Sequence, residues 1–373
     1  MVENREQFKN FVMSIIERRH GDVMKSTVEN SEWHREENVF VHTQMVVNEF
    51  MQRSVDFSFT EFRLGLIVCA YHDTGKYWVK QEHPNGGFSF YNHEVNSANT
   101  LRNDYWVDPE VRAIFSDDEA EMHFVRFLIQ THLPYKMQGQ HLSVLKASII
   151  YYGEQAMLTA DQSLKIFKNC ILSDAMGRIS DNHAEKIRDV YTWFENFDNL
   201  DIFKFSVGDP FPILTMVSGA MGAGKTTMIR EMIENYKNED IDTIYISFDE
   251  IRHEICQREF GINYTNEQLH GCDALVNGEV TKRLAQIRKN FKKDQKLVVF
   301  VDTTFVTRRR RIFIKESLKI GSVDFIEIDK PLSWHLTNNA KRTGREFVPA
   351  HTVKTSYFST CMPLVDEIFY VEK

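Results

Sequence analysis

The stretch ILTMVSGAMGAGKTTMIREMIENY, residues 213–236, decides the fold class of the second half of the chain. A mostly apolar run predicts a buried strand, a glycine-rich turn follows, and apolar residues then recur at helical spacing. Similar short apolar runs recur downstream as TIYISF, LVVFVD and SVDFIEI, with helical segments between them. Strands that alternate with helices form parallel sheets of right-handed βαβ units, so this half is predicted to be an α/β domain.

The turn has the pattern G-x-x-x-x-G-K-[ST] and runs from Gly219 to Thr226. In such a loop, backbone N–H groups and the positive end of the following helix surround a phosphate. The lysine reaches the terminal phosphates of a nucleoside triphosphate, and the Thr226 hydroxyl binds Mg²⁺. We therefore predict ATP or another NTP with Mg²⁺ as the cofactor, bound by Gly219, Gly222, Gly224, Lys225, Thr226 and Thr227.

Two carboxylates follow neighbouring predicted strands, at the edge where open α/β sheets bind ligands. Asp249 could accept the proton of a hydroxyl that attacks the γ-phosphate, and Arg252 could hold a phosphate of the acceptor. A helix-capping aspartate and a solvated arginine would explain the same two residues. Asp302 could support Mg²⁺ or position substrate groups.

Arginines gather in two later segments. The run Arg308 to Arg311 is the obvious basic cluster in a chain of net charge −8, although a solvated helix face explains it equally well. Arg342 and Arg345 lie in NNAKRTGREFVP, residues 338–349. Arginines in a mobile lid neutralise charge on a transferring phosphoryl group, and a basic surface loop is the alternative.

The first half, to about Leu200, carries apolar residues at three- and four-residue intervals and is predicted to be all-α. FSVGDPFP, at 205–212, has the glycine and prolines of a linker. The expected domains are therefore a helical domain at 1–200, a linker at 201–212 and an α/β domain at 213–373. A charged N-terminus without a signal-peptide pattern, scattered cysteines and no long apolar run favour the cytoplasm and exclude a membrane span.

The helical half carries six residues of the kind that bind metals: His42, His72, Asp73, His93, His132 and Asp174. A single histidine of this kind is usually a core residue, but six ligand-type residues spread over several predicted helices and helix ends indicate a shared site. Adjacent His72 and Asp73 are expected on one helix, about 100° apart, so both could enter it. Imidazole with carboxylate suits Mn²⁺, Fe, Co²⁺, Ni²⁺, Cu²⁺ or Zn²⁺. Two ions bridged by Asp73 and a hydroxide would attack a phosphoester.

Residues 213–373 resemble the 5′-kinase module of polynucleotide kinases: phosphate loop, D-x-x-R, a strand-end D-T-T followed by arginines, then K-R-T-G before V-P. The resemblance implies that Asp249 is the general base, that Arg252 contacts an acceptor phosphate and that Arg342 is the lid arginine. That family often has a second arginine where this chain has Asn338. Arg345 would then take over that role, or the lid would contribute less.

The contexts VHTQMV, YHDTGK, NHEVNSA, IQTHL and LSDAMGR, between residues 41 and 178, resemble in order the five motifs of HD-superfamily phosphohydrolases. The resemblance implies two metals held by the six residues. The spacing of His34 and His42 also resembles the HD domain of some tRNA nucleotidyltransferases. His34 is therefore a candidate catalytic residue, with a plain surface histidine as the alternative. Lys76 is a second candidate, because it could neutralise a substrate phosphate.

Together the halves resemble the HD-Pnk family nearly end to end, which implies RNA end healing. The helical half would remove a 2′,3′-cyclic phosphate or 2′-phosphate, and the other half would phosphorylate a 5′-OH. The chain has no ligase lysine motif, so a separate RNA ligase would seal the ends. A small-molecule kinase fused to an HD nucleotide phosphohydrolase, or a metal-bound sensor that regulates a nucleotide switch, remain alternatives. RNA or DNA preference, the preferred NTP, the metal and the oligomeric state stay open.

Overall fold

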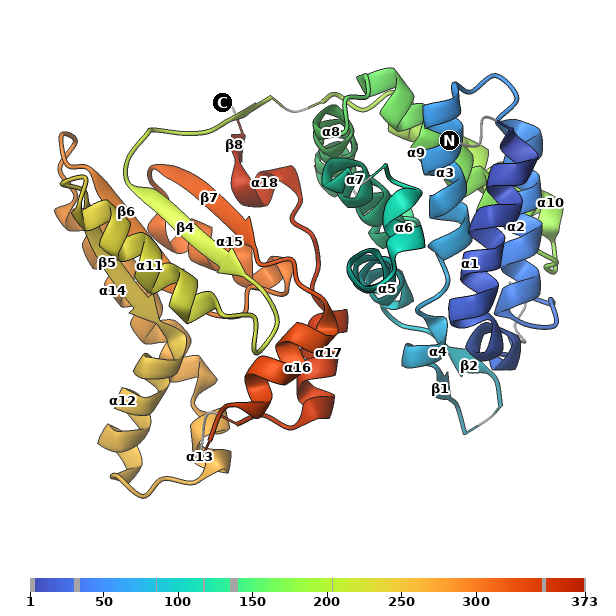
Figure 1. Cartoon of the computed structure of the whole chain (residues 1–373). Helices are drawn as coiled ribbons and strands as arrows, with labels where there is room; N and C mark the ends of the chain where they lie inside the picture. Colours follow the sequence, from blue (N-terminus) through green and yellow to red (C-terminus); the bar gives the residue numbers. More distant parts are fainter. Residues whose placement is uncertain are drawn as a thin grey trace. The chain divides into compact units, whose positions relative to one another are not determined.

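The computed structural model describes residues 4–29, 34–84, 86–116, 118–134, 140–202, 204–343 and 347–371. The chain divides into two compact units, residues 1–203 and 204–373. Helices dominate the first unit, and the second contains an open parallel sheet (Figure 1). Among the described residues, no helix has both the length and the apolar character needed to cross a bilayer.

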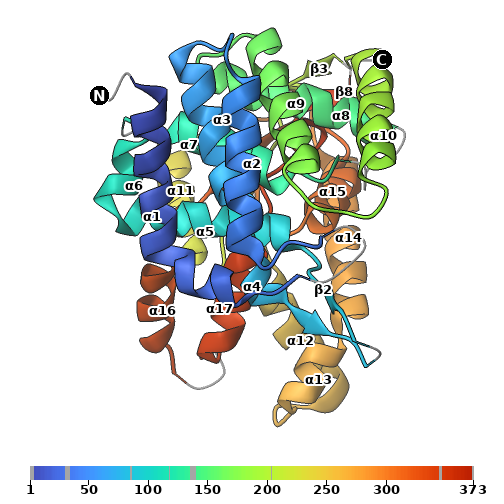
Figure 2. The ribbon, with the colours of Figure 1, turned by 90° about the vertical axis from the view of Figure 1, so that its right-hand side faces the viewer.

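The first unit is built around a central helix. Its helices are α1 (Arg5–Ser26), α2 (Val39–Arg53), α3 (Phe59–Tyr71), α4 (Lys76–Val79), α5 (His93–Val107), α6 (Pro109–Ala113), α7 (Glu119–Gln130), α8 (Gln140–Gln155), α9 (Ala160–Met176) and α10 (His183–Asp198). Helix α3 contacts α1, α2, α7 and α9, and its mostly apolar residues from Glu61 to Tyr71 are all buried. Figure 2 shows α3 beside α1 and α2.

This unit differs from the all-α prediction in three places. A hairpin of β1 (Gln81–Glu82) and β2 (Phe88–Ser89) follows α4, because glycines at 86 and 87 adopt positive φ in its turn. Helix α3 ends at Tyr71, so His72 is its C-cap and Asp73 lies in the following turn rather than on the helix. The segment 145–177, which carries helical apolar spacing throughout, is divided between α8 and α9, since Thr159 begins α9 with a capping box.

The second unit confirms the predicted parallel sheet, in the order β5-β6-β4-β7. Its elements are β3 (Phe205–Ser206), β4 (Ile213–Ser218), α11 (Lys225–Lys237), β5 (Asp242–Ser247), α12 (Phe248–Phe260), α13 (Asn266–Gly271), α14 (Asp273–Asn290), β6 (Leu297–Asp302), α15 (Arg308–Leu318), β7 (Ser322–Glu327), α16 (Leu332–Ala340), α17 (Ala350–Phe358), α18 (Val365–Ile368) and β8 (Tyr370–Val371).

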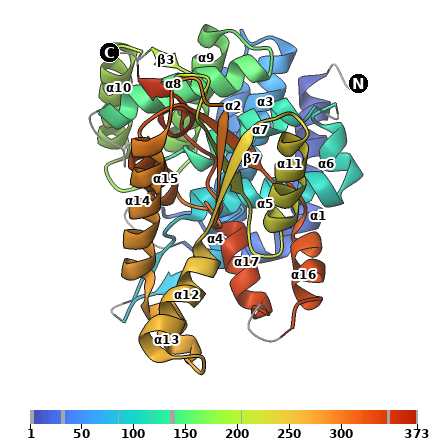
Figure 3. The same cartoon turned by 90° about the vertical axis from the view of Figure 1, so that its left-hand side faces the viewer.

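Helices cover both faces of this sheet. Val298 and Phe300 of β6 pack toward Ile229 of α11, whereas Val299 and Val301 pack toward α12, α14 and α15. Figure 3 shows α11 on one side of the strands and α14 and α15 on the other. Strands β4 and β6 are parallel neighbours, so the segments that follow them meet at one edge of the sheet.

Part of the predicted linker belongs to the second unit. Phe205 of β3 lies opposite Val371 of β8, and Ser206 lies opposite Tyr370, in an antiparallel pair. Strands of two residues have no detectable periodicity, so the glycine and prolines around them dominated the sequence pattern.

Candidate functional site

The structure brings the six metal-ligand candidates together from six separate places in the helical unit. His42 lies on α2, His72 caps α3, Asp73 lies in the turn after α3, His93 begins α5, His132 follows α7, and Asp174 lies near the end of α9. All six are buried. Among the described residues, three groups have ligand atoms within 4.8 Å of one another. Two are made of these six residues, namely His42 with His72 and Asp174, and Asp73 with His93 and His132; the third joins His42 to His34 and Glu36.

The hydrogen bonds of the histidines fix which ring nitrogen carries the proton. Three Nδ1 atoms lie close to a backbone carbonyl oxygen three residues earlier: His72 at 2.8 Å from that of Cys69, His93 at 2.7 Å from that of Phe90, and His132 at 2.7 Å from that of Ile129. A carbonyl only accepts, so each Nδ1 must be the donor, and each neutral ring then presents an Nε2 lone pair.

The Nε2 atoms of the four histidines lie in two pairs. The Nε2 atoms of His42 and His72 are 3.3 Å apart, and those of His93 and His132 are also 3.3 Å apart. The lone pairs of His93 and His132 repel at this distance unless a proton or a metal ion lies between them, and the raised pKa of His42 lets it donate to His72 when no metal is bound. The arrangement therefore fits a metal site, where the second ring nitrogen commonly donates to a carbonyl or carboxylate.

Asp73 joins the two groups through its two carboxylate oxygens. Oδ2 lies 3.1 Å from His72 Nε2 and 3.4 Å from His42 Nε2, while Oδ1 lies 3.2 Å from His93 Nε2 and 3.9 Å from His132 Nε2. Burial opposes ionisation of Asp73, but the charges of His72 and its other neighbours hold its pKa well below the usual range. A charged carboxylate thus faces both histidine pairs.

The charge of the cluster is unevenly distributed around its histidines. Burial opposes protonation of His42, yet Asp174, Glu36 and Asp73 together raise its pKa to about 9. Burial lowers the pKa of His132 to about 3, with the help of neighbouring histidines. Negative charge is therefore concentrated around His42, and a cation would be stabilised most strongly there.

Lys76 enters this cluster from the first turn of α4. Its Nζ lies 2.7 Å from Asp73 Oδ2 and donates to Glu29 Oε1 at 2.6 Å. Burial disfavours the ammonium, but the two carboxylates raise the pKa of Lys76 above its ordinary value. The lysine is therefore charged and already paired with two carboxylates, and a role toward substrate stays a prediction.

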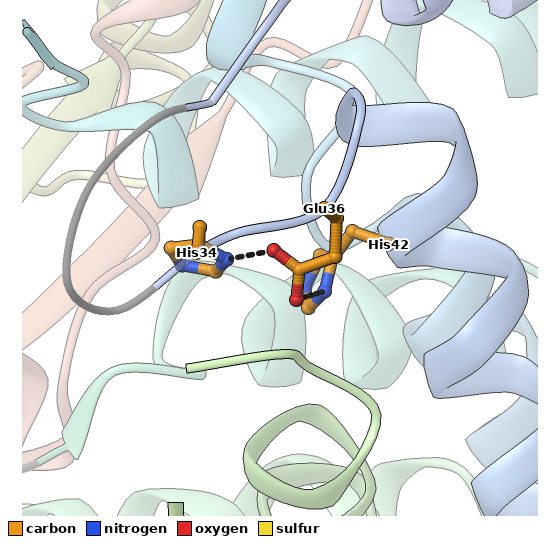
Figure 4. Close-up of side chains that lie close together, drawn as sticks. All are labelled: His34, Glu36 and His42. Carbon is orange, nitrogen blue, oxygen red and sulfur yellow. Dashed lines mark ion pairs between the residues drawn. The ribbon is translucent and has the colours of Figure 1, made fainter. Parts of the chain in front are cut away.

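Glu36 is a residue of this site that we did not predict from the sequence. Figure 4 shows its carboxylate between His34 and His42, with Oε2 3.4 Å from His34 Nδ1 and Oε1 3.5 Å from His42 Nδ1. The backbone N–H of Ile179 donates to Oε1 at 2.6 Å and anchors the carboxylate. Glu36 thus faces the side of the His42 ring opposite to Asp73. His34 lies at the edge of the cluster with its side chain 17% exposed, and its catalytic role stays a prediction.

Arg178 is a second residue that was missed. Its guanidinium pairs with Asp174 Oδ2 at 2.6 Å, one helical turn away. The only sequence signal was the fifth motif, LSDAMGR, which ends on this arginine.

Among the described residues, the buried imidazoles and carboxylates of this unit form groups that could hold metal ions.

In the second unit, the glycine loop between β4 and α11 has the backbone that its sequence demands. Gly222 and Gly224 have φ of 81° and 96°, and a Cβ on Gly222 would lie 2.4 Å from the His335 carbonyl oxygen. Lys225 Nζ donates to the carbonyls of Gly219 at 2.9 Å and Ala220 at 3.1 Å. Thr227 is exposed in the first turn of α11.

Asp302 connects this loop to the end of β6. Its Oδ2 accepts hydrogen bonds from Thr226 Oγ1 at 2.7 Å and from Tyr245 Oη at 2.8 Å. Burial lowers the pKa of Lys225 to about 8; the charge of Asp302 opposes this shift, and that of Arg342 adds to it. Lys225, Thr226, Asp302 and Arg342 therefore share one neighbourhood. Arg345 lies outside the described residues.

Helix α16 contacts the glycine loop directly. His335 Nδ1 lies 3.2 Å from the Met221 carbonyl oxygen, and Asn338 Nδ2 donates to the Gly222 carbonyl at 3.3 Å. Asn338 thus has a structural partner in the loop. The sequence had not indicated His335 or this contact.

Asp249 and Arg252 lie in the first turns of α12. Asp249 is 86% exposed, and Arg252 pairs with it at 2.6 Å and with Asp273 at 2.9 Å. The helix cap is Ser247, whose side chain accepts from the Glu250 N–H, so the capping explanation for Asp249 is wrong. Arg252 is likewise not a solvated arginine but an ion-paired one.

The basic run in α15 is not a continuous polyanion surface. Arg308 pairs with Asp366 at 2.6 Å, and Arg311 is fully buried against Glu367. Both arginines hold the segment of α18 against α15. A four-residue charge run at helical spacing necessarily sends some side chains inward, which the sequence pattern alone could not reveal.

The sequence matches no protein-family model and no curated protein. Among solved structures, it is similar to a chain of the "Structure of the Pnkp1/Rnl/Hen1 RNA repair complex", with 18% identity and a TM-score of 0.31. The match covers 44% of this chain and 46% of that chain, so it spans about half of each.

Proposed function

We propose that the chain is an RNA end-healing enzyme with two activities. The helical unit removes a 2′,3′-cyclic phosphate or 2′-phosphate, and the second unit phosphorylates 5′-OH ends with an NTP. The observation that carries the proposal is Asp73, whose two oxygens face two separate histidine pairs at 3.1 to 3.9 Å. A bridging carboxylate of this kind is the feature that a two-metal phosphoesterase requires.

The phosphoesterase part follows from the charges around the cluster. Bound divalent transition-metal ions would supply a hydroxide near neutral pH and stabilise the developing oxyanion. Backbone carbonyls hold three imidazoles in the tautomer that a metal needs, and Glu36 faces Nδ1 of His42 at 3.5 Å. Lys76 helps to keep Asp73 ionised, and His34, at the edge of the cluster, would contact the phosphoester.

The kinase part uses the loop and the exposed end of α12. Lys225 would exchange two loop carbonyls for the phosphates of the NTP, while Thr226 and Asp302 would hold Mg²⁺. Asp249 is exposed and can take the proton of an attacking hydroxyl. Arg252 would exchange Asp273 for an acceptor phosphate, and Arg342 would neutralise the transferred group.

A small-molecule kinase fused to a nucleotide phosphohydrolase remains the second candidate, because one structural observation favours it. A free arginine run would favour a polyanionic acceptor, but Arg308 and Arg311 form ion pairs within the domain. Comparing a 5′-OH oligonucleotide with a free nucleoside separates the two. Similar kcat/KM for both acceptors would favour the second candidate.

The decisive experiment follows both chemistries in one preparation. γ-Labelled ATP with 5′-OH RNA or DNA reports the kinase, and phosphate release from RNA with a 2′,3′-cyclic end reports the phosphoesterase, with Mn²⁺, Co²⁺, Ni²⁺, Cu²⁺ or Zn²⁺ added. Lys225→Ala should remove only the first activity, by about 10² to 10³-fold. Loss of neither activity, or failure of the wild type to label any 5′-OH end, would reject the proposal.

A further inference from the structure

Three aromatic side chains are exposed beside the metal-ligand cluster. Tyr77 is 44% exposed, Trp78 58% and Tyr91 68%, although large aromatic side chains are usually mostly buried. None of them is needed for the core of the unit. Exposed apolar side chains that gather in one place mark contact sites.

The chain itself places these aromatics next to the cluster. Tyr77 and Trp78 directly follow Lys76 in α4, and Tyr91 precedes His93 by two residues. Consecutive Cα atoms are about 3.8 Å apart, so each aromatic Cα lies within about 8 Å of a cluster residue's Cα. Helices α4 and α5 contact each other, so both segments lie on the same side of the unit, next to the hairpin (Figure 2).

The aromatic rings in and just after the hairpin contact lysine side chains of the same unit. Lys80 Nζ lies 3.7 Å from the centroid of the Phe88 ring, and Lys76 Nζ lies 5.6 Å from that of Phe90. Both rings are half-buried, which fixes the segment that carries Tyr91. The three exposed rings therefore stand on a packed support.

We propose that Tyr77, Trp78 and Tyr91 form a stacking platform for unpaired bases at the 3′ end of RNA. This inference rests on the phosphoesterase function proposed above, because it places the terminal phosphate at the metal cluster. The charge of the molecule supports stacking over electrostatic attraction. The chain has a net charge of −8, and Lys76 is paired with two carboxylates. Stacking on aromatic rings binds bases without requiring positive charge and tolerates any sequence.

The first test separates base binding from chemistry. Trp78→Ala and Tyr91→Ala in the full metal-loaded chain should raise KM for RNA with a 2′,3′-cyclic end by about 5- to 150-fold. Glycerol 1,2-cyclic phosphate has the same cyclic phosphodiester without a base, and its kcat/KM should not change. Trp78→Phe should restore most of the loss. Tyr191→Ala, at a 46% exposed tyrosine on α10, is the matched control and should resemble the wild type.

A second measurement does not depend on hydrolysis. A 3′-OH RNA oligonucleotide with 2-aminopurine as its last base should lose fluorescence on binding the wild type and not on binding Trp78→Ala. The chain could quench this fluorescence through Trp78 and yet fail to cleave a cyclic phosphate. That result would support the platform and reject the phosphoesterase function. Equal RNA kinetics for wild type, Trp78→Ala and Tyr91→Ala would overturn the platform. If the kinetics are equal and the variants also differ from the wild type in oligomeric mass, the platform is overturned as well. The aromatic residues would then belong to a contact between protein chains.

Discussion

Replacing Asp73 by asparagine keeps the shape of the side chain and removes its charge. Its oxygens lie 3.1 Å from His72 Nε2 and 3.2 Å from His93 Nε2, so one of the two histidine pairs would meet an amide N–H in place of an acceptor. Loss of a residue that only orients a ligand costs about 10- to 100-fold in metal affinity. A residue shared by both groups should cost more, so we expect more than about 100-fold, with metal content falling in both groups.

His132→Gln provides the comparison, because His132 belongs to only one group. This variant should keep about half of the metal, whereas Asp73→Asn should keep almost none. The assay combines elemental analysis of the purified chain with phosphate release from RNA carrying a 2′,3′-cyclic end. Transfer of the γ-phosphate to 5′-OH RNA should be unchanged in both variants, because that site lies in a separate core. If Asp73→Asn binds as much metal as the wild type and hydrolyses the cyclic end, the bridging role is refuted.

Four further changes test other parts of the structure. Glu36→Gln should lower metal affinity about 10- to 100-fold, measured by competition with a chelator, and leave the kinase intact. Asp249→Ala should slow 5′ phosphorylation about 10² to 10⁴-fold with unchanged NTP affinity; normal transfer rates would remove it from the role of base. Arg311→Met removes the buried ion pair with Glu367, to which only Arg308 at 3.5 Å would then remain paired, so denaturant unfolding should show a loss of about 3–5 kcal/mol, and a loss within error would contradict a stabilising role of the pair. Burial raises the pKa of Asp324 above its ordinary value. The folded state therefore loses stability as the pH rises from the ordinary aspartate pKa through this higher pKa. Asp324→Asn should raise Tm at pH 8, and the gain in Tm should shrink in acid.

The strands and the glycine loop could be predicted because each depends on neighbouring residues. The run Leu297–Asp302 is apolar enough to require burial on both faces, and it forms β6 as expected. Gly222 and Gly224 are the residues whose positive φ the loop needs. In β6 and in the glycine loop, the residues that form the sequence pattern also determine the local backbone structure.

The contacts that complete the sites could not be predicted, because they join segments far apart in sequence. Glu36 meets His42 only because Ile179, more than 140 residues later, anchors its carboxylate. The contact of His335 with the glycine loop likewise depends on how α16 returns to the sheet. The end of α3 at Tyr71 is set by the packed turn that follows, where no proline or glycine marks the boundary directly.

The pairing of β3 with β8 brings the entry strand of the second unit beside its last described strand. A domain whose first and last strands pair in this way can be inserted into another polypeptide. It can also be circularly permuted, with its two ends joined and new ends opened elsewhere. The turn after α12 is a natural place for such an opening, since Ile262 is 77% exposed and Gly261 has φ of 78°. A circular permutant opened there would keep every strand of the parallel sheet, so the architecture tolerates a different chain order.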